Sequence, residues 1–213
     1  MTKIKKVLLI CAVVLVVAIV VSACYLSSIY TDCRMSNETF ENSLAQPVGE
    51  YVDADMLYAD EEKAIFYYIN GIFVYNYNYD KIEQMIDLEK LNCAINQPEP
   101  TNGITIHASS DGKKLGLYNY AQGDEEKQFD NYLIYTETGI GKKEAEPDIG
   151  NGGGIGWASW IAELDCWRSG MFVYVGKDSF YLELEDDEQI TQLKLVAVDE
   201  NNQRKEFYPF DDK

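Results

Sequence analysis

The first hydrophobic pattern in the chain is a continuous apolar run near its N-terminus. Residues 7–24 read VLLICAVVLVVAIVVSAC without a charge, and the only charges before them are Lys3, Lys5 and Lys6. A helix needs about 20 apolar residues to cross a bilayer, and a basic start before such a run is typical of secretory signals and membrane anchors. The run therefore predicts a cell-membrane protein whose bulk lies on the extracytoplasmic side.

From residue 51 onward the pattern alternates with period two and is broken by turn residues, which predicts half-buried strands. An apolar run over residues 64–69, the dipeptide Asn70-Gly71 and a second run over residues 72–79 predict a hairpin. Residues 80–91 fit a helix or a strand, and we favour a strand. Further strands are predicted over residues 104–108, 114–120, 132–136, 171–175, 179–184, 191–198 and 204–210.

One segment departs from this alternation. Five glycines lie between residues 150 and 156, and they predict a flexible hinge. A phosphate-binding loop is disfavoured because no Lys-Ser or Lys-Thr pair follows them. Beyond the hinge, apolar residues fall on one helical face and predict a short amphipathic helix that ends near Gly170. The residues of this pattern are Trp157, Trp160, Ile161 and Leu164, with Trp167 near the end.

These elements predict a mainly β fold, with antiparallel hairpins in a partial-propeller or sandwich arrangement and one short amphipathic helix. Residues 1–23 are the expected signal or membrane-anchor segment. Residues 24–48 lack sustained periodicity and are rich in Ser, Thr, Asn, Asp and Gln, which predicts a flexible tether. Residues 49–213 are expected to form one extracytoplasmic β-rich domain.

Charge narrows the choice of partners. The whole chain has a net charge of −18, and removing residues 1–23 takes away three lysines and no acid, which leaves −21. Such a surface repels nucleic acid. Besides the membrane reached through the N-terminal anchor, the expected partners are another envelope protein or a carbohydrate.

Cysteine and histidine usage argues against metal and cofactor chemistry. Once Cys24 is assigned to the anchor, the odd set Cys33, Cys93 and Cys166 leaves a Cys93–Cys166 bridge open but argues against a disulfide framework. The single histidine, His107, argues against His-rich metal sites. Acidic clusters at residues 53–62 and 183–188 lack the spacing of a calcium loop, and we predict no catalytic residue, metal or cofactor.

Two aromatic groups are the candidate binding surfaces. Aromatic faces stack on sugar rings and accept partner side chains, but the same stripes also fill cores. The first group is the alternating stripe Tyr75, Tyr77 and Tyr79, and the second comprises Trp157, Trp160 and Trp167.

Two resemblances add to these patterns. Residues 21–24, VSAC, resemble the lipobox of bacterial lipoproteins, which implies cleavage before Cys24 and lipidation of Cys24 with a fatty acid such as palmitate. We favour this interpretation over an uncleaved helix that runs from Val7 to about Leu26. The segment SSDGKKLGLYNY from Ser109, with weak echoes from Gly71, Asn131 and Gly170, resembles strand pairs of β-propeller blades. It is also similar to the extracellular part of antibiotic-sensing membrane metallopeptidase transducers.

The sequence therefore predicts a membrane-anchored binding or sensing protein without catalytic activity. One alternative is a hydrolase of envelope polymers that uses residues of the acidic clusters. The other alternative is an accessory subunit that docks on a membrane protein through the Trp-rich helix.

Overall fold

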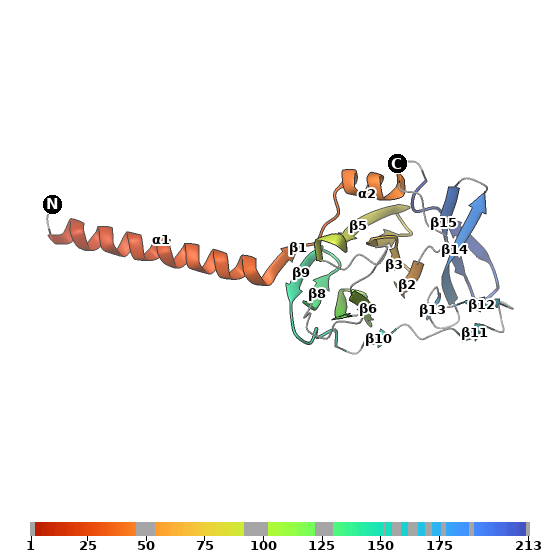
Figure 1. Ribbon diagram of the computed structural model, residues 1–213. Helices are drawn as coiled ribbons and strands as arrows, with labels where there is room; N and C mark the ends of the chain where they lie inside the picture. The colour runs from red at the N-terminus through yellow and green to blue at the C-terminus, as the bar shows by residue number, and fades with distance from the viewer. Residues whose placement is uncertain are drawn as a thin grey trace.

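The computed structural model describes most of the chain. The described residues are 3–45, 54–91, 102–121, 130–150, 152–154, 159–161, 166–168, 172–175, 178–187 and 190–211. A long helix, α1 (Lys3–Ile29), projects from a β-rich body (Figure 1). The stretch Ile10–Ile29 is long and apolar enough to cross a membrane, and none of it is buried. Helix α1 is therefore compatible with a membrane anchor or a signal segment.

Three antiparallel sheets form the body. In the first sheet the strands follow sequence order, β2 (Ala54–Ala59), β3 (Lys63–Tyr68), β4 (Gly71–Asn76) and β5 (Lys81–Asp87). The second contains β6 (Asn102–Ser109), β7 (Lys114–Ala121), β8 (Tyr132–Tyr135) and β9 (Ile140–Lys143), with β1 (Tyr30–Asp32) added beside β9 and β10 (Gly152–Gly154) beside β6. The third consists of β13 (Phe172–Val175), β14 (Asp178–Asp187), β15 (Ile190–Val198) and β16 (Arg204–Phe207).

Smaller elements complete the described chain. Helix α2 (Asn37–Ala45) follows β1, and a single 3₁₀ turn, η1 (Glu89–Leu91), follows β5. Strands β11 (Ser159–Ile161) and β12 (Cys166–Arg168) form a separate antiparallel pair. The stacked sheets confirm the predicted mainly β class and correspond to its sandwich form.

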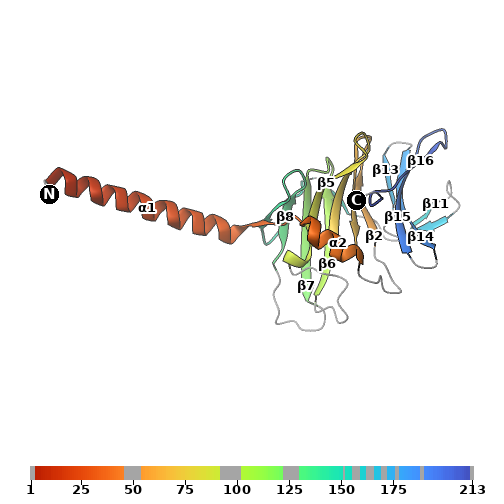
Figure 2. The same cartoon turned by 90° about the horizontal axis from the view of Figure 1, so that it is seen from above.

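The β2–β5 sheet lies between the other two, as Figure 2 shows. On one of its faces Ile65 and Tyr67 join a buried cluster with Leu115 of β7. On the other face Phe66 joins a second cluster with Leu182 of β14. A sheet covered on both faces needs apolar residues at successive positions. This explains why residues 64–69 form an unbroken apolar run.

The predicted hairpin and the predicted strand after it are both present. Tyr68 pairs with Gly71, so the turn consists of Ile69 and Asn70, one residue earlier than expected. A Cβ atom at Gly71 would lie 2.8 Å from Cε of Met35, so this glycine provides close packing rather than turn geometry. Of the two readings of residues 80–91, the strand is confirmed as β5.

The amphipathic helix expected after the glycines is wrong. In its place Trp160 lies opposite Trp167 in the β11–β12 pair. The hinge prediction also fails in part, because Gly152–Gly154 pair with β6. Helical spacing is a local signal, whereas a strand gains its hydrogen bonds from a partner elsewhere in the chain.

The structure also differs from the flexible tether expected over residues 24–48. Helix α1 extends to Ile29 and leads directly into β1, and α2 is capped by the Ser36 hydroxyl, which accepts a hydrogen bond from the Thr39 amide at 3.1 Å. Met35 and Phe40 are buried in the cluster on the β14 side. Residues 30–42 therefore belong to the folded body.

Candidate functional site

Residues 30–35, which we term the strap, connect α1 to two sheets at once. Residues 30–32 pair with β9 of the second sheet. The next residues cross to β5 of the first sheet, where the Cys33 carbonyl accepts a hydrogen bond from the Asp87 amide at 2.7 Å. The Met35 amide donates to the Met85 carbonyl at 2.9 Å. The strap therefore joins the two sheets at the point where the chain leaves α1.

Glycines make room for the strap side chains. A Cβ atom at Gly141 would lie 2.6 Å from Sγ of Cys33, and one at Gly139 would lie 2.5 Å from Cγ of Arg34. Gly139 also has a φ of 66°, a conformation that other residues rarely adopt. The fit between strap and glycines shows that this junction is packed rather than loosely apposed.

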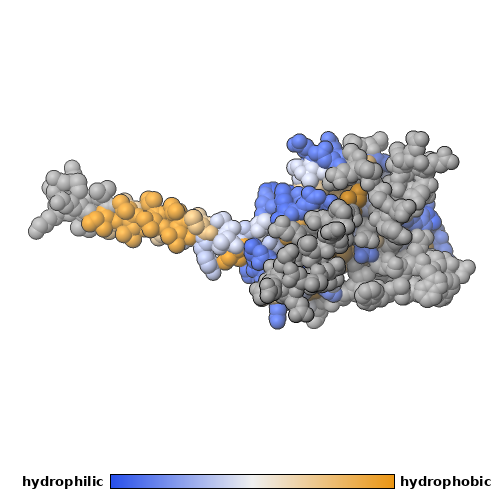
Figure 3. Space-filling view, viewed as in Figure 1, coloured by the Kyte–Doolittle hydropathy of each residue, from blue (hydrophilic) through white to orange (hydrophobic). Residues whose placement is uncertain are grey.

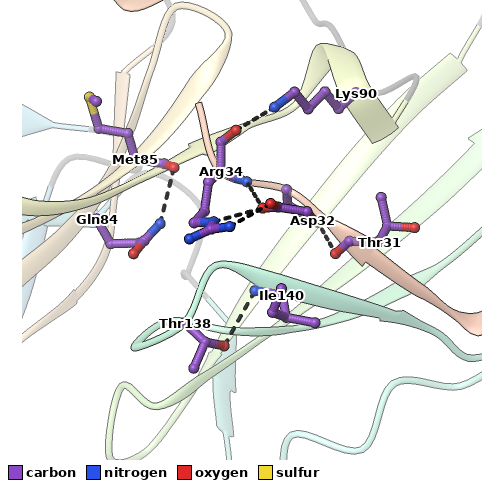
Figure 4. A network of polar contacts seen from close by, with 9 residues as sticks. Thr31, Asp32, Arg34, Gln84, Met85, Lys90, Thr138 and Ile140 are labelled. Carbon is purple, nitrogen blue, oxygen red and sulfur yellow. Dashed lines mark hydrogen bonds and ion pairs between the residues drawn. The ribbon is translucent and has the colours of Figure 1, made fainter. Parts of the chain in front are cut away.

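Polar contacts hold the exposed side of the strap, as Figure 4 shows. Arg34 donates from Nε to Oδ1 of Asp32 at 2.8 Å and from Nη2 to Oδ2 at 2.6 Å. This bidentate contact lowers the pKa of the Asp32 carboxyl to about 2. Lys90 of η1 donates to the Arg34 carbonyl, which adds a third element to the junction.

A polar cleft of about 390 Å³ opens between the first and second sheets, where their hairpin turns meet. Lys63 and Lys113 are its cationic lining residues among those described. The acidic lining residues are Asp60, Glu62, Glu83, Asp111 and Glu137. The lining therefore carries an excess of negative charge.

Two of these carboxylates shape the turns. Oδ1 of Asp60 accepts hydrogen bonds from the amides of Glu62 and Lys63, both at 2.8 Å. Oδ1 of Asp111 accepts from the Ser109 hydroxyl at 2.7 Å, and this bond lowers the pKa of Asp111. Such side-chain bonds to nearby backbone are what Asp provides in tight turns.

The two sides of the cleft are also tied to each other. The carbonyl of Gly112 accepts a hydrogen bond from Nζ of Lys63 at 3.3 Å and another from the Thr136 hydroxyl at 2.7 Å. A Cβ atom at Gly112 would lie 2.6 Å from the Tyr58 ring, so only glycine fits there. Glu62, Glu83 and Glu137 remain exposed at the cleft.

The tyrosine stripe is not a surface. Tyr75 is 1% and Tyr77 is 9% exposed, and both pack in the core, where Tyr77 lies against Phe180. Tyr79 is 69% exposed because β4 ends at Asn76 and the following turn directs it outward. Of the three tyrosines, therefore, only Tyr79 is available to a partner.

The other predicted site residues are only partly described. Trp157 and Cys93 lie outside the described residues, as do the side chains of Trp160, Trp167 and Cys166, so their proposed contacts stay predictions. Cys24 is exposed on α1, and its carbonyl accepts a hydrogen bond from the Ser27 hydroxyl at 2.9 Å.

Sequence reasoning missed the strap and the cleft. Cys33, Met35 and Phe40 were signals of burial within a segment interpreted as a tether. The cleft had no comparable signal, because it depends on how two sheets stack. No protein-family model matches the chain, and no curated protein matches it either. Its function is therefore inferred from helix α1, the strap and the cleft.

Proposed function

We propose that the protein is a membrane-anchored, extracytoplasmic binding or sensing protein that binds cationic ligands in the acidic cleft. The observation that carries this proposal is the cleft itself, which lies where the turns of two packed sheets meet. Binding residues often lie on loops that a rigid scaffold positions. Five carboxylates against two lysines favour a partner that carries amine or guanidinium groups, such as a basic peptide segment of another envelope protein.

Binding is better supported than hydrolysis. A general acid needs a carboxyl whose pKa is raised, whereas the Ser109 hydroxyl lowers the pKa of Asp111. Asp60 already serves as the acceptor for two backbone amides. In the second acidic cluster, Glu183 pairs with Arg204 at 2.6 Å. These three carboxylates therefore act as acceptors for turn hydrogen bonds or as an ion-pair partner.

A peptide titration tests the cleft. We expect the full-length protein to bind a lysine-rich peptide and not a glutamate-rich peptide of equal length. Exposed ion pairs contribute up to about 1 kcal/mol each, so Glu83→Gln with Glu137→Gln should weaken binding about tenfold. Glu41→Gln, which removes an exposed charge on α2, is the matched control. The cleft would be refuted as the site if the double variant bound the lysine-rich peptide as tightly as the Glu41→Gln control, or if wild type bound the two peptides equally.

For the anchor, we infer that α1 is retained as a transmembrane helix, because it continues without a break past Cys24 and leads directly into β1. The lipobox-like VSAC motif supports a second candidate, cleavage before Cys24 and lipidation of its thiol. Intact mass separates the two anchors. A retained helix gives the full-length mass in wild type and in Cys24→Ala, whereas lipidation gives a shorter, acylated wild-type chain.

The accessory-subunit hypothesis has lost its basis. It required a Trp-rich helix as the docking element, and the segment contains two paired strands.

A further inference from the structure

We propose that the β-rich body rests on the bilayer by the edge formed by β1 and β9, with phospholipid headgroups as the partner of this edge. The proposal rests on the anchoring by α1 inferred above. Figure 1 shows β1 and β9 nearest to α1, while β6 and β10 of the same sheet lie farther away. In Figure 3 the apolar part of the helix projects from this end of the body, with a paler, more polar stretch between the two.

The length of the helix brings this edge to the headgroups. An apolar span of about 20 residues, at about 1.5 Å per residue, matches the hydrocarbon core of about 30 Å. Tyr30 follows directly after the span when it is taken as Ile10–Ile29, and four residues, or about 6 Å, after it when it is taken as residues 7–26. The headgroup layer on each side is about 5–7 Å thick. Strand β1 therefore begins within that layer.

Exposed aromatic residues lie at the depth of the headgroup layer. Tyr25 and Tyr30, on either side of the end of the span, are both exposed. Tyrosines are enriched at membrane interfaces because the ring is apolar and the hydroxyl is polar. Tyr30 pairs with Lys142 of β9, so the pairing brings a strand more than 100 residues away in sequence to the level of the headgroups.

The charge of this edge differs from that of the whole chain. Each charged residue of β1 and β9 has an oppositely charged partner, in the pairs Asp32–Arg34, Lys142–Glu144 and Lys143–Asp130. These three pairs carry no net charge, and Glu137 and Glu146 are exposed carboxylates flanking β9, on a chain whose net charge is −18. An acidic face would be repelled by anionic headgroups, whereas these balanced pairs are not.

The junction has no flexible joint that would let the body swing away. The Ser28 hydroxyl donates to the Tyr25 carbonyl at 2.7 Å near the end of α1, and the helix continues to Ile29. Tyr30 is already paired in β1, and the strap is then bonded to β5. Lifting the edge off the membrane would break these bonds or bend the end of α1.

The test compares thiol labelling at two positions in nanodiscs. Lys143→Cys introduces a thiol on β9, and Lys205→Cys introduces one on the exposed surface of β16. Each is made in the full chain with and without twelve Gly/Ser residues inserted between Ile29 and Tyr30. A membrane-impermeant maleimide is used, and the rates are read from the individual peptides, so that labels on native cysteines do not interfere.

We expect the thiol at position 143 to react several-fold faster when the spacer is present, and the thiol at position 205 to react at the same rate in both chains. Equal rates at position 143 with and without the spacer would overturn the proposal. Ala145→Cys repeats the comparison without removing the Lys143–Asp130 ion pair. Failure of the inferred transmembrane anchor is distinguishable, because the chain would then either not co-purify with the nanodiscs or co-purify with the shorter, acylated mass expected for lipidation at Cys24.

Discussion

Gly139 and Gly150 share a left-handed backbone, with φ values of 66° and 69°, but differ in their surroundings. A Cβ atom at Gly139 would meet Arg34 and Gln84 at 2.5 Å, whereas nothing lies within 4 Å at Gly150. Gly150→Ala should cost about 1 kcal/mol from backbone conformation alone. Gly139→Ala should cost about 2–4 kcal/mol, because overpacking is added. Denaturant unfolding measures both, and equal costs would contradict the packed strap.

Tyr75 and Tyr77 provide a second residue-scale comparison. Tyr75 donates a hydrogen bond to Asp80, whereas the buried Tyr77 hydroxyl has no hydrogen-bond partner in the described structure. Removing an unsatisfied hydroxyl is neutral or stabilising, whereas removing a bonded one costs about 1 kcal/mol. Tyr77→Phe should therefore unfold at the same or a higher urea concentration than wild type, and Tyr75→Phe at a lower one. If Tyr77→Phe unfolded at a lower urea concentration than Tyr75→Phe, the Tyr77 hydroxyl could not be the one without a hydrogen-bond partner.

At the scale of elements, α2 should be part of the fold rather than a tether. Phe40 is 5% exposed, and its ring lies 5.7 Å from that of Phe73 and 5.5 Å from that of Phe210. Phe40→Ala should cost about 3–5 kcal/mol of unfolding free energy. Glu41→Ala, at the exposed next position, should change it by less than about 0.5 kcal/mol. Similar unfolding curves for the two variants would mean that this segment is a flexible tether and not part of the fold.

The strap should also show a defined response to acid. Arg34 holds the pKa of Asp32 at about 2, below its usual 3.8. Because the folded pKa is the lower one, this pair stabilises the fold above about pH 4, and its contribution is lost as the pH falls towards 2. The effect is modest, since both side chains are about half exposed. In Asp32→Asn the unfolding free energy should fall less steeply than in wild type between pH 4 and pH 2. Above pH 5 the two plots of unfolding free energy against pH, measured by denaturant unfolding, should run parallel.

At the scale of the whole molecule, the minimal folded unit should begin at Tyr30. The pattern of the sequence places the domain at residues 49–213, but a chain of that length lacks β1, the strap and Phe40. We expect residues 30–213 to unfold cooperatively, and residues 49–213 to be much less stable because Gly139, Gly141 and Gly71 would then line empty space. Unfolding followed by circular dichroism and by tryptophan fluorescence checks this expectation. Equal unfolding midpoints for residues 30–213 and residues 49–213 would contradict it.

The sequence by itself determined the features that depend on local pattern. The uncharged run at residues 7–24 predicted α1, and alternation with turn residues predicted the hairpin of β3 and β4, the strand β5 and the mainly β class. These signals suffice because helix length and strand alternation are properties of neighbouring residues.

Only the tertiary structure decided which apolar face meets which neighbour. It buried Tyr75 and Tyr77, made Gly152–Gly154 a strand on β6, and placed the strap between two sheets. It also gathered the turn carboxylates around the cleft, although Asp60 and Asp111 are far apart in sequence. Strand pairing and sheet stacking depend on partners that are distant along the chain, and a local sequence pattern does not indicate which distant segment the partner is.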